Sequence, residues 1–232
     1  MDTNNERAAM VRAQLEQRGI HDSRVLEAMA AVPRHLFVPE EARAQAYGDH
    51  ALPISEGQTI SQPFIVALMA QTLCLTRRDR LLEIGAGSGY AAAVLSLLAG
   101  EVYAIERRPS LAQSAEARLH ELGYTNVHIF IGDGTAGLPA YAPFDAIVVS
   151  AAAPWVPQPL REQLAEDGRM VIPVGGRNEQ FLLRVTRKHH QINTERLGEV
   201  RFVPLIGDHA WEPTAGEPHS KRSDSHRDMG DS

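Results

Sequence analysis

Three glycines that interrupt an apolar run have the clearest chemical meaning in this sequence. In the segment LLEIGAGSGY the apolar residues end at Ile84, and Gly85, Gly87 and Gly89 follow at once. This pattern predicts a buried strand, a tight turn whose backbone comes close to a ligand, and a helix beyond it. Such turns hold the sugar and the phosphate or amino-acid part of nucleotide-like cofactors. The sequence therefore indicates a cofactor site at this turn.

Acidic residues near the ends of the first three predicted strands extend this site. Glu106 ends the second strand, roughly 20 residues after the turn, where an acid accepts hydrogen bonds from ribose hydroxyls. We expect Asp133, in the segment GDG, to accept from the exocyclic amine of adenine. Glu83 lies inside the first strand and departs from a purely apolar pattern. The alternative is a turn that binds nothing, with Glu106 solvated and Asp133 a simple turn residue.

The spacing of the glycines bears on which cofactor is bound. The dinucleotide fingerprint G-x-G-x-x-G would need a glycine at Tyr90, where this chain has G-x-G-x-G instead. A dehydrogenase that uses NAD is the first alternative, and it is disfavoured by this mismatch.

A second segment, QTISQP at residues 58–63, lies upstream of the glycine turn. Ser61 is predicted to cap the following helix and Pro63 to occupy its first turn. A capping serine places its hydroxyl beside free backbone N–H groups, which is a setting suited to holding a carboxylate. Ser61 could therefore both cap the helix and hold a carboxylate.

The elements around these segments alternate between strand and helix, which is typical of a parallel α/β sheet. Strands are predicted at 80–84, 101–105, 127–131, 145–149, 169–174, 180–187 and 199–204. Helices are predicted at 90–98, 110–122 and 158–164. The last two strands are expected to form an antiparallel hairpin joined by KHHQINTERLG. The predicted fold is thus a Rossmann-like, doubly wound, seven-stranded and mostly parallel sheet.

The rest of the chain flanks this sheet. Residues 1–75 carry helical signals and form an N-terminal helical extension that contains QTISQP, while residues 76–210 form the cofactor-binding core. Residues 211–232 are polar and lack apolar periodicity, so we expect a disordered tail. The net charge of −6 disfavours nucleic acid as a partner. No long apolar run or signal-like N-terminus is present, and Cys74 is the only cysteine, so the expected location is the cytoplasm.

Several motifs together are similar to one family of enzymes. The matching segments are AVPRHLFVP, ALPISEGQTISQP, LLEIGAGSGY, GDGTAGLP, PFDAIVVSAAAP, MVIPVG and RFVPL. They resemble class I methyltransferases that use S-adenosylmethionine, and in particular the protein L-isoaspartate (D-aspartate) O-methyltransferases, along nearly the whole chain. QTISQP is the most family-specific segment, because many methyltransferases share the cofactor motifs.

The resemblance implies roles for individual residues. It places the active-site serine at Ser61 and the substrate contacts at Ser61, Gln62 and Val203. Gln62 stands where the family often has alanine, and Phe64 where it often has histidine, so these two departures are expected to tune how substrate is held. The implied S-adenosylmethionine contacts are Gln58, Thr59, Ile60, Glu83, Gly85, Ala86, Gly87, Ser88, Gly89, Glu106, Asp133 and Gly134.

The reaction implied by the resemblance is methyl transfer to the free carboxylate of L-isoaspartyl residues in damaged proteins and peptides. The methyl ester would then cyclise to a succinimide that reopens partly to aspartate, so the implied function is protein repair by a monomer. The second alternative is a non-catalytic domain that senses such a carboxylate, and the third is a methyltransferase with another acceptor.

Other chemistries find little support in the sequence. No Cys/His ligand cluster indicates a metal site, and His189 and His190 are predicted to be solvated in a loop. Cys74 is predicted to be a core residue on the apolar face of a helix. Ser88 belongs to the glycine turn and lacks the G-x-S-x-G context of a nucleophilic serine.

Overall fold

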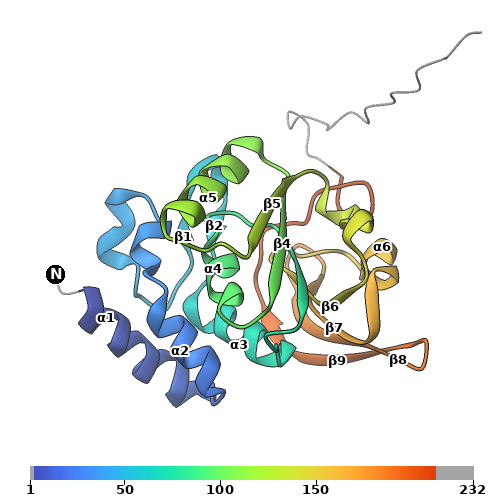
Figure 1. Ribbon diagram of the computed structural model, residues 1–232, viewed down its shortest axis with the longest axis horizontal. Helices are drawn as coiled ribbons and strands as arrows, with labels where there is room; N and C mark the ends of the chain where they lie inside the picture. The colour runs from blue at the N-terminus through green and yellow to red at the C-terminus, as the bar shows by residue number, and fades with distance from the viewer. Residues whose placement is uncertain (1–2, 213–232) are drawn as a thin grey trace, which may run out of the picture.

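The computed structural model describes residues 3–212 and shows a seven-stranded sheet flanked by helices (Figure 1). The strands run in the order β5-β4-β3-β6-β7-β8-β9. Their bounds are β3 Arg80–Ile84, β4 Glu101–Glu106, β5 Val127–Ile131, β6 Phe144–Val149, β7 Leu164–Gly175, β8 Gln180–Lys188 and β9 Gln191–Val200. The strands from β5 to β7 are parallel, and β8 is antiparallel to both of its neighbours. The predicted α/β class, strand number and antiparallel hairpin are confirmed.

The helices that follow the parallel strands are α4 (Tyr90–Ser96) after β3, α5 (Pro109–Glu121) after β4 and α6 (Gln158–Glu162) after β6. Each predicted helix exists, with ends displaced by one or two residues. Pro109 opens α5 at a first-turn position, where the missing N–H of proline costs no hydrogen bond.

The last strand differs from its prediction. β9 spans Gln191–Val200, which includes most of the segment expected to be a loop, and only the first two residues of the predicted strand 199–204 belong to it. Lys188 pairs with Gln191, so the hairpin turns through His189 and His190 alone. Both have positive φ, 51° and 60°, the backbone of a two-residue turn that matches strand twist. Nearly every β9 side chain is exposed, so the strand lacks the apolar alternation that sequence reading requires.

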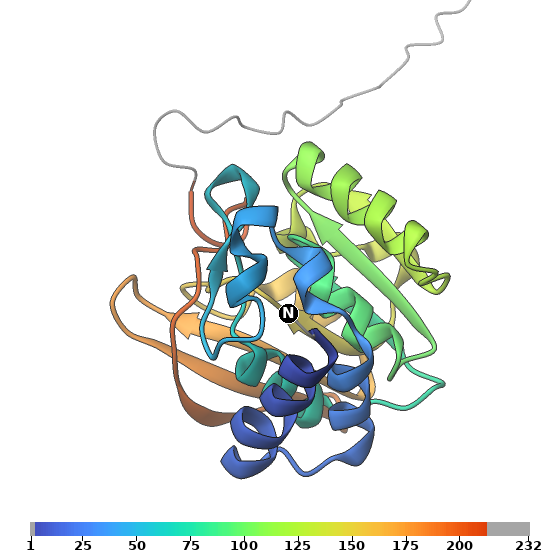
Figure 2. The same cartoon turned by 90° about the vertical axis from the view of Figure 1, so that its left-hand side faces the viewer.

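The N-terminal segment is largely helical, as expected. Helix α1 (Thr3–Met10) continues through a π-helical stretch, Val11–Leu15, and a final 3₁₀ turn that stops at Gly19 with φ of 96°. Helix α2 (Ser23–Ala31) begins at Asp22, whose side chain accepts the N–H of Arg24. Short 3₁₀ turns and a small antiparallel pair, β1 (Leu52–Pro53) and β2 (Thr59–Ile60), lead to α3 (Pro63–Leu73). Figure 2, which faces this segment, shows it lying across one side of the molecule.

Two apolar clusters occupy the two faces of the sheet. Successive strand residues point to opposite faces, so Leu81 belongs to one cluster and Leu82 to the other. The first cluster includes side chains of the N-terminal segment, α3 and α4, whereas the second includes Leu160 of α6. Because the first cluster contains residues from both parts of the chain, the N-terminal segment packs directly on the sheet. Its loop containing QTISQP is thereby fixed against the glycine turn.

Two local predictions at the ends of this region need correction. Cys74 is exposed, with φ of 47° at the end of α3, and is therefore not a core cysteine. Trp211, predicted to begin the tail, donates its indole N–H to the carbonyl of Ala152 at 3.1 Å and belongs to the folded part. The remainder of the predicted tail, residues 213–232, lies outside the described residues.

Candidate active site

A cavity of about 260 Å³ opens at the carboxyl ends of β3, β4 and β6. Ligands of open α/β sheets bind at this edge, because the loops that follow the parallel strands converge there. The cavity is lined by the glycine turn, by residues 57–61, by residues 105–108, by Gly134, by residues 150–151 and by residues 203–206. Segments that lie far apart in the sequence therefore form one site.

The glycine turn forms the floor of this cavity. Gly85, Gly87 and Gly89 have φ values of 88°, 54° and 86°, a region that side chains with a Cβ atom rarely adopt. A Cβ atom at Gly89 would also lie 3.2 Å from Leu119 and 3.3 Å from Ala115 in α5. The turn thus needs glycine both for its backbone conformation and for close packing of the helix behind it. Ala86 and Ser88, between the glycines, line the same cavity.

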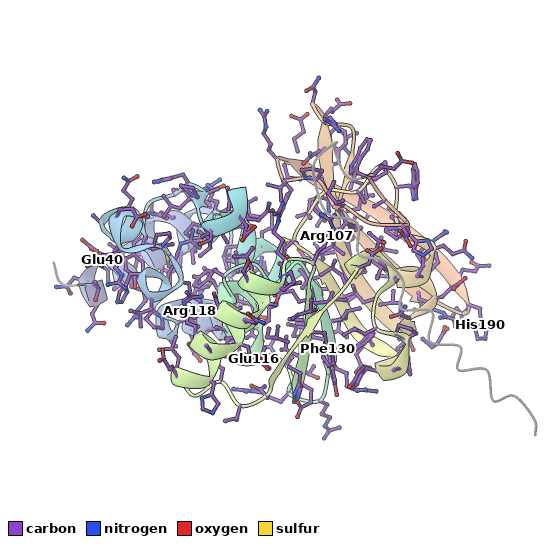
Figure 3. The ribbon with its side chains drawn as sticks, turned by 90° about the horizontal axis from the view of Figure 1, so that it is seen from above. Glu40, Arg107, Glu116, Arg118, Phe130 and His190 are labelled. Atoms are coloured by element: carbon purple, nitrogen blue, oxygen red, sulfur yellow. The ribbon has the colours of Figure 1, made fainter. Side chains whose placement is uncertain are left out.

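Helix α5 supports the turn from behind. Arg118 donates from Nη1 to the carbonyl oxygen of Ser88 at 2.9 Å. Its guanidinium carbon lies 5.9 Å from the ring centre of Phe37 in the N-terminal segment. Figure 3 shows Arg118 where α5 faces that segment. This arginine therefore links the cofactor turn to the part of the chain that carries Ser61.

Glu106 connects the end of β4 to the glycine turn. Its two carboxylate oxygens accept the N–H of Gly87 at 2.9 Å and the N–H of Arg108 at 3.0 Å. The side chain lines the cavity and the residue is only 7% exposed. A carboxylate held by two backbone donors keeps a fixed direction and still has lone pairs for ligand hydroxyls. Its proposed contact with ribose remains a prediction.

Glu83 is fully buried beneath the turn and also lines the cavity. Within residues 3–212, neither of its carboxylate oxygens has a hydrogen-bond partner. Burial, and then the nearby charge of Glu106, raise the pKa of Glu83 well above its ordinary value. A buried carboxylate without a partner is costly, and a cationic ligand group would supply the missing positive charge, while an ammonium group would also supply hydrogen-bond donors. This site therefore fits a ligand that carries an ammonium or sulfonium group.

Tyr90 forms a part of the wall that sequence reasoning missed, and Arg34 packs on its ring. Tyr90 opens α4 and lines the cavity, and burial raises its pKa to about 12, so the phenol is neutral. The buried guanidinium of Arg34 lies 4.8 Å from its ring centre and donates to the carbonyl oxygen of Ala46 at 2.8 Å. The motif PRHLF contains the arginine, but its distance in sequence from Tyr90 hides the contact.

The upstream segment reaches the same cavity. Gln58, Thr59, Ile60 and Ser61 all line it, from β2 and the turn before α3. The predicted helix cap is wrong, because α3 is capped by Gln62 and starts at Pro63, one residue later than a Ser61 cap requires. Ser61 therefore lies one residue before the cap position and contributes to the cavity wall.

The hydrogen-bond partners of Asp133 in the structure belong to the protein itself. Its carboxylate accepts the N–H of Thr135 at 2.8 Å, the hydroxyl of Thr135 at 2.7 Å and the N–H of Asp208 at 2.8 Å. The neighbouring Gly134 lines the cavity, whereas Asp133 is not among the lining residues. Within the described chain, Asp133 thus fastens the C-terminal segment, and a contact with adenine stays a prediction.

That C-terminal segment closes one side of the site. Ala152 donates its N–H to the carbonyl oxygen of Val203 at 2.8 Å and accepts the N–H of Leu205 at 2.8 Å. Val203 lines the cavity, as do Pro204, Leu205 and Ile206, which sequence reasoning did not single out. Ser150 and Ala151, which precede Ala152, also line the cavity, and their small side chains leave space in it.

A short loop before QTISQP is fastened to the start of α5 beside the cavity. Glu56, whose φ is 60°, accepts from Ser110 Oγ at 2.8 Å and pairs with Arg108 at 3.3 Å. The neighbouring Arg107 also lines the cavity, and Figure 3 places it between the N-terminal and C-terminal parts of the molecule.

Residues considered for other chemistry lie elsewhere. His189 and His190 are exposed, and Figure 3 shows His190 far from the N-terminal segment. Among residues 3–212, no group of three or more His, Cys, Asp and Glu side chains could hold a metal ion. No helix in the same range combines the length and apolar character needed to cross a bilayer.

We next compared the chain with known proteins, beginning with family models and curated sequences. The family model described as "Protein-L-isoaspartate(D-aspartate) O-methyltransferase (PCMT)" matches residues 5–210. The chain is 64% identical over 211 residues to the protein-L-isoaspartate O-methyltransferase of Roseiflexus sp. (strain RS-1), covering 91% of this chain and 96% of that one. It is 56% identical over 212 residues to protein-L-isoaspartate O-methyltransferase 2 of Marinobacter nauticus, covering 90% and 97%.

Solved structures give the same result. One protein-L-isoaspartate O-methyltransferase superposes with a TM-score of 0.78 at 28% identity, covering 88% of this chain and 67% of that one. A Plasmodium falciparum protein assigned to the same enzyme class, in complex with S-adenosyl-L-homocysteine, gives a TM-score of 0.76 at 28% identity, covering 86% and 98%. The chain belongs to the protein-L-isoaspartate (D-aspartate) O-methyltransferase family.

Proposed function

We propose that this chain methylates the free carboxylate of L-isoaspartyl residues in damaged proteins and peptides, with S-adenosylmethionine as the methyl donor. The observation that supports this most directly is that Ser61 and the glycine turn line one cavity, although they belong to separate segments. A donor-binding turn and a hydroxyl suited to a carboxylate are thereby brought together.

The cofactor-binding roles follow from the described contacts. Glu106, fixed by two backbone N–H groups, accepts from the ribose hydroxyls. Glu83 faces the positive charge of the donor, and the glycine turn permits close approach of the backbone. The full set of proposed S-adenosylmethionine contacts is Gln58, Thr59, Ile60, Glu83, Gly85, Ala86, Gly87, Ser88, Gly89, Glu106, Asp133 and Gly134.

The acceptor side is proposed to consist of Ser61, Gln62 and Val203. Ser61 donates its hydroxyl to one oxygen of the substrate carboxylate, and Val203 contacts the peptide from the opposite wall. A carboxylate with a pKa near 4 is ionised at neutral pH and is itself the nucleophile, so the enzyme needs no general base. When bound, S-adenosylmethionine supplies an electrophilic methyl group on a sulfonium.

The chain's contribution is then mainly positional. Holding two reactants in line lowers the barrier by up to ~7–11 kcal/mol in well-oriented intramolecular reactions. Partial exclusion of water by residues 203–206 strengthens the hydrogen bond from Ser61. The methyl ester leaves the site and closes without enzyme to a succinimide, which reopens partly to aspartate.

Methyl incorporation into paired peptides that differ only in aspartate or isoaspartate tests this function. We expect labelling of the isoaspartyl peptide alone. Equal labelling of both peptides would favour another carboxyl acceptor. Binding of the isoaspartyl peptide without labelling would favour a non-catalytic sensor.

The setting in which the enzyme works is also part of this proposal. A single cysteine and a net charge of −6 fit a reducing cytoplasm and protein rather than nucleic-acid substrates. The enzyme is further proposed to act as a monomer. Sedimentation at working concentration would test the oligomeric state.

A further inference from the structure

Four side chains close to Ser61 in the structure form a connected group, and one of them is Gln62, a proposed acceptor-side residue whose contact with substrate is still unassigned. Gln62 donates from Nε2 to the side chain of Asp49 at 2.7 Å and to its carbonyl oxygen at 3.1 Å. The other carboxylate oxygen of Asp49 accepts from Arg18 Nη1 at 2.6 Å. The guanidinium carbon of Arg18 lies 3.8 Å from the ring centre of Phe64. We call these four residues the Gln62 cluster.

The cluster joins three separate parts of the chain. Arg18 ends the first helical stretch, Asp49 lies in the loop before β1, and Gln62 and Phe64 lie at the start of α3. It includes Gln62 and Phe64, the two positions at which the resemblance implied a departure from the family pattern. The two departures are thus parts of one structure rather than independent changes.

Asp49 determines which way the amide of Gln62 faces. A carboxylate and a carbonyl oxygen can only accept, so the NH₂ end of Gln62 must point to Asp49. The amide oxygen Oε1 then faces away from Asp49. Among the described residues, this oxygen accepts no hydrogen bond. The cluster therefore presents an oriented and unused acceptor directly after Ser61.

A peptide substrate supplies donors that match this acceptor. When its isoaspartyl carboxylate lies at Ser61, the adjoining main-chain N–H groups lie a few bonds away. We propose that Gln62 Oε1 accepts one of these N–H groups, and that Asp49, fixed by Arg18 and Phe64, is the positioning residue that orients Gln62. This inference rests on the proposed function. A hydrogen bond from the peptide main chain to Gln62 would form whatever side chains flank the isoaspartyl residue of the substrate.

The exposure of the ion pair supports an orienting role over a stabilising one. The side chains of Arg18 and Asp49 are 41% and 37% exposed. Exposed ion pairs contribute little to folding stability, because water and salt screen them. Fixing the direction of the Gln62 amide, in contrast, decides whether a bound peptide meets the acceptor Oε1 or the donor Nε2.

Steady-state methylation of an isoaspartyl peptide tests the inference. Gln62→Ala should raise KM for the peptide about two- to tenfold, as loss of one hydrogen bond predicts, with kcat and the KM for S-adenosylmethionine unchanged. Asp49→Ala should raise the peptide KM to a similar extent. The double variant should match Gln62→Ala alone, because Asp49 acts through Gln62.

Backbone-modified peptides identify the partner directly. Two esters, each replacing the amide N–H on one side of the isoaspartyl residue, should be compared with the parent peptide. One ester should raise KM for the wild type and have no effect on Gln62→Ala. If neither ester affects the wild type, or if Asp49→Ala leaves the peptide KM unchanged, the inference is wrong.

The controls separate this inference from folding and from the proposed function. Glu166→Ala removes a similarly exposed carboxylate, paired with Arg187 at 3.7 Å on the β7–β8 side, and should change nothing. If Asp49→Ala does not fold, Asp49→Asn keeps the packing but can also donate, and should still raise KM. Equal labelling of aspartyl and isoaspartyl peptides by the wild type would instead overturn the proposed function.

Discussion

The backbone N–H of Gly87 donates to Glu106 Oε2 at 2.9 Å, so the turn after β3 and the acid that ends β4 form one unit. The other oxygen of the same carboxylate accepts the N–H of Arg108. Gly87, after β3, and Glu106, at the end of β4, therefore hold each other in position.

Replacing Glu106 by alanine should weaken binding of S-adenosylhomocysteine about ten- to 100-fold, the range for hydrogen bonds to a charged group. Calorimetric titration measures this directly. An analogue that lacks the ribose hydroxyls should bind the wild type and the variant with similar affinity. Glu101→Ala, at the opposite end of the same strand, removes an exposed partner of His128 and should leave the affinity unchanged.

Ser61→Ala should lower kcat on an isoaspartyl peptide about ten- to 100-fold, because the hydroxyl orients a charged nucleophile without reacting itself. Affinity for S-adenosylhomocysteine should stay close to that of the wild type. Ser55→Ala, in the same loop but outside the cavity, is the matched control. An unchanged kcat for Ser61→Ala would remove Ser61 from the mechanism.

Glu83→Gln should stabilise the empty protein at neutral pH and weaken binding of the cationic donor. Folding raises the pKa of Glu83, so the folded state holds this proton more tightly than the unfolded state. Its contribution to stability is therefore present below the ordinary pKa of 4.5 and is lost as pH rises toward the raised pKa. The stability difference between variant and wild type should grow over that interval in urea unfolding measured at several pH values.

The same carboxyl group predicts a linked proton. A cation bound beside Glu83 favours its ionised form, so binding should release a proton at pH values below the raised pKa. Titrations in two buffers with different ionisation enthalpies would detect the proton. Glu83→Gln should abolish the release, and persistence of the release in this variant would assign it to another group.

Gly89→Ala should destabilise the fold by about 2–4 kcal/mol, from backbone strain together with overpacking against Leu119 and Ala115. Gly123→Ala separates the two contributions. Gly123 has a similar φ of 79°, but a Cβ atom there would meet nothing within 4 Å. It should therefore cost only the backbone part, about 1–2 kcal/mol. Equal losses for both variants in thermal unfolding would show that packing at Gly89 is unimportant.

The sequence by itself determined most of the sheet and the cofactor turn. Apolar runs mark both the buried strand β3 and the edge strand β5, so these two strands were predicted with the bounds that the structure has. The glycine turn and Glu106 are local signals, because each follows a strand directly. β9 escaped prediction since an exposed edge strand has no apolar pattern.

Only the tertiary structure decided which distant residues meet. Asp133 binds the backbone of Asp208, 75 residues away, and Gln62 is oriented by Asp49 across a loop. Such contacts depend on how the segments pack on the sheet, and no local propensity encodes them. The sequence thus predicted a donor turn and a carboxylate-binding serine, whereas packing of the N-terminal segment on the sheet decided that these two segments share one cavity.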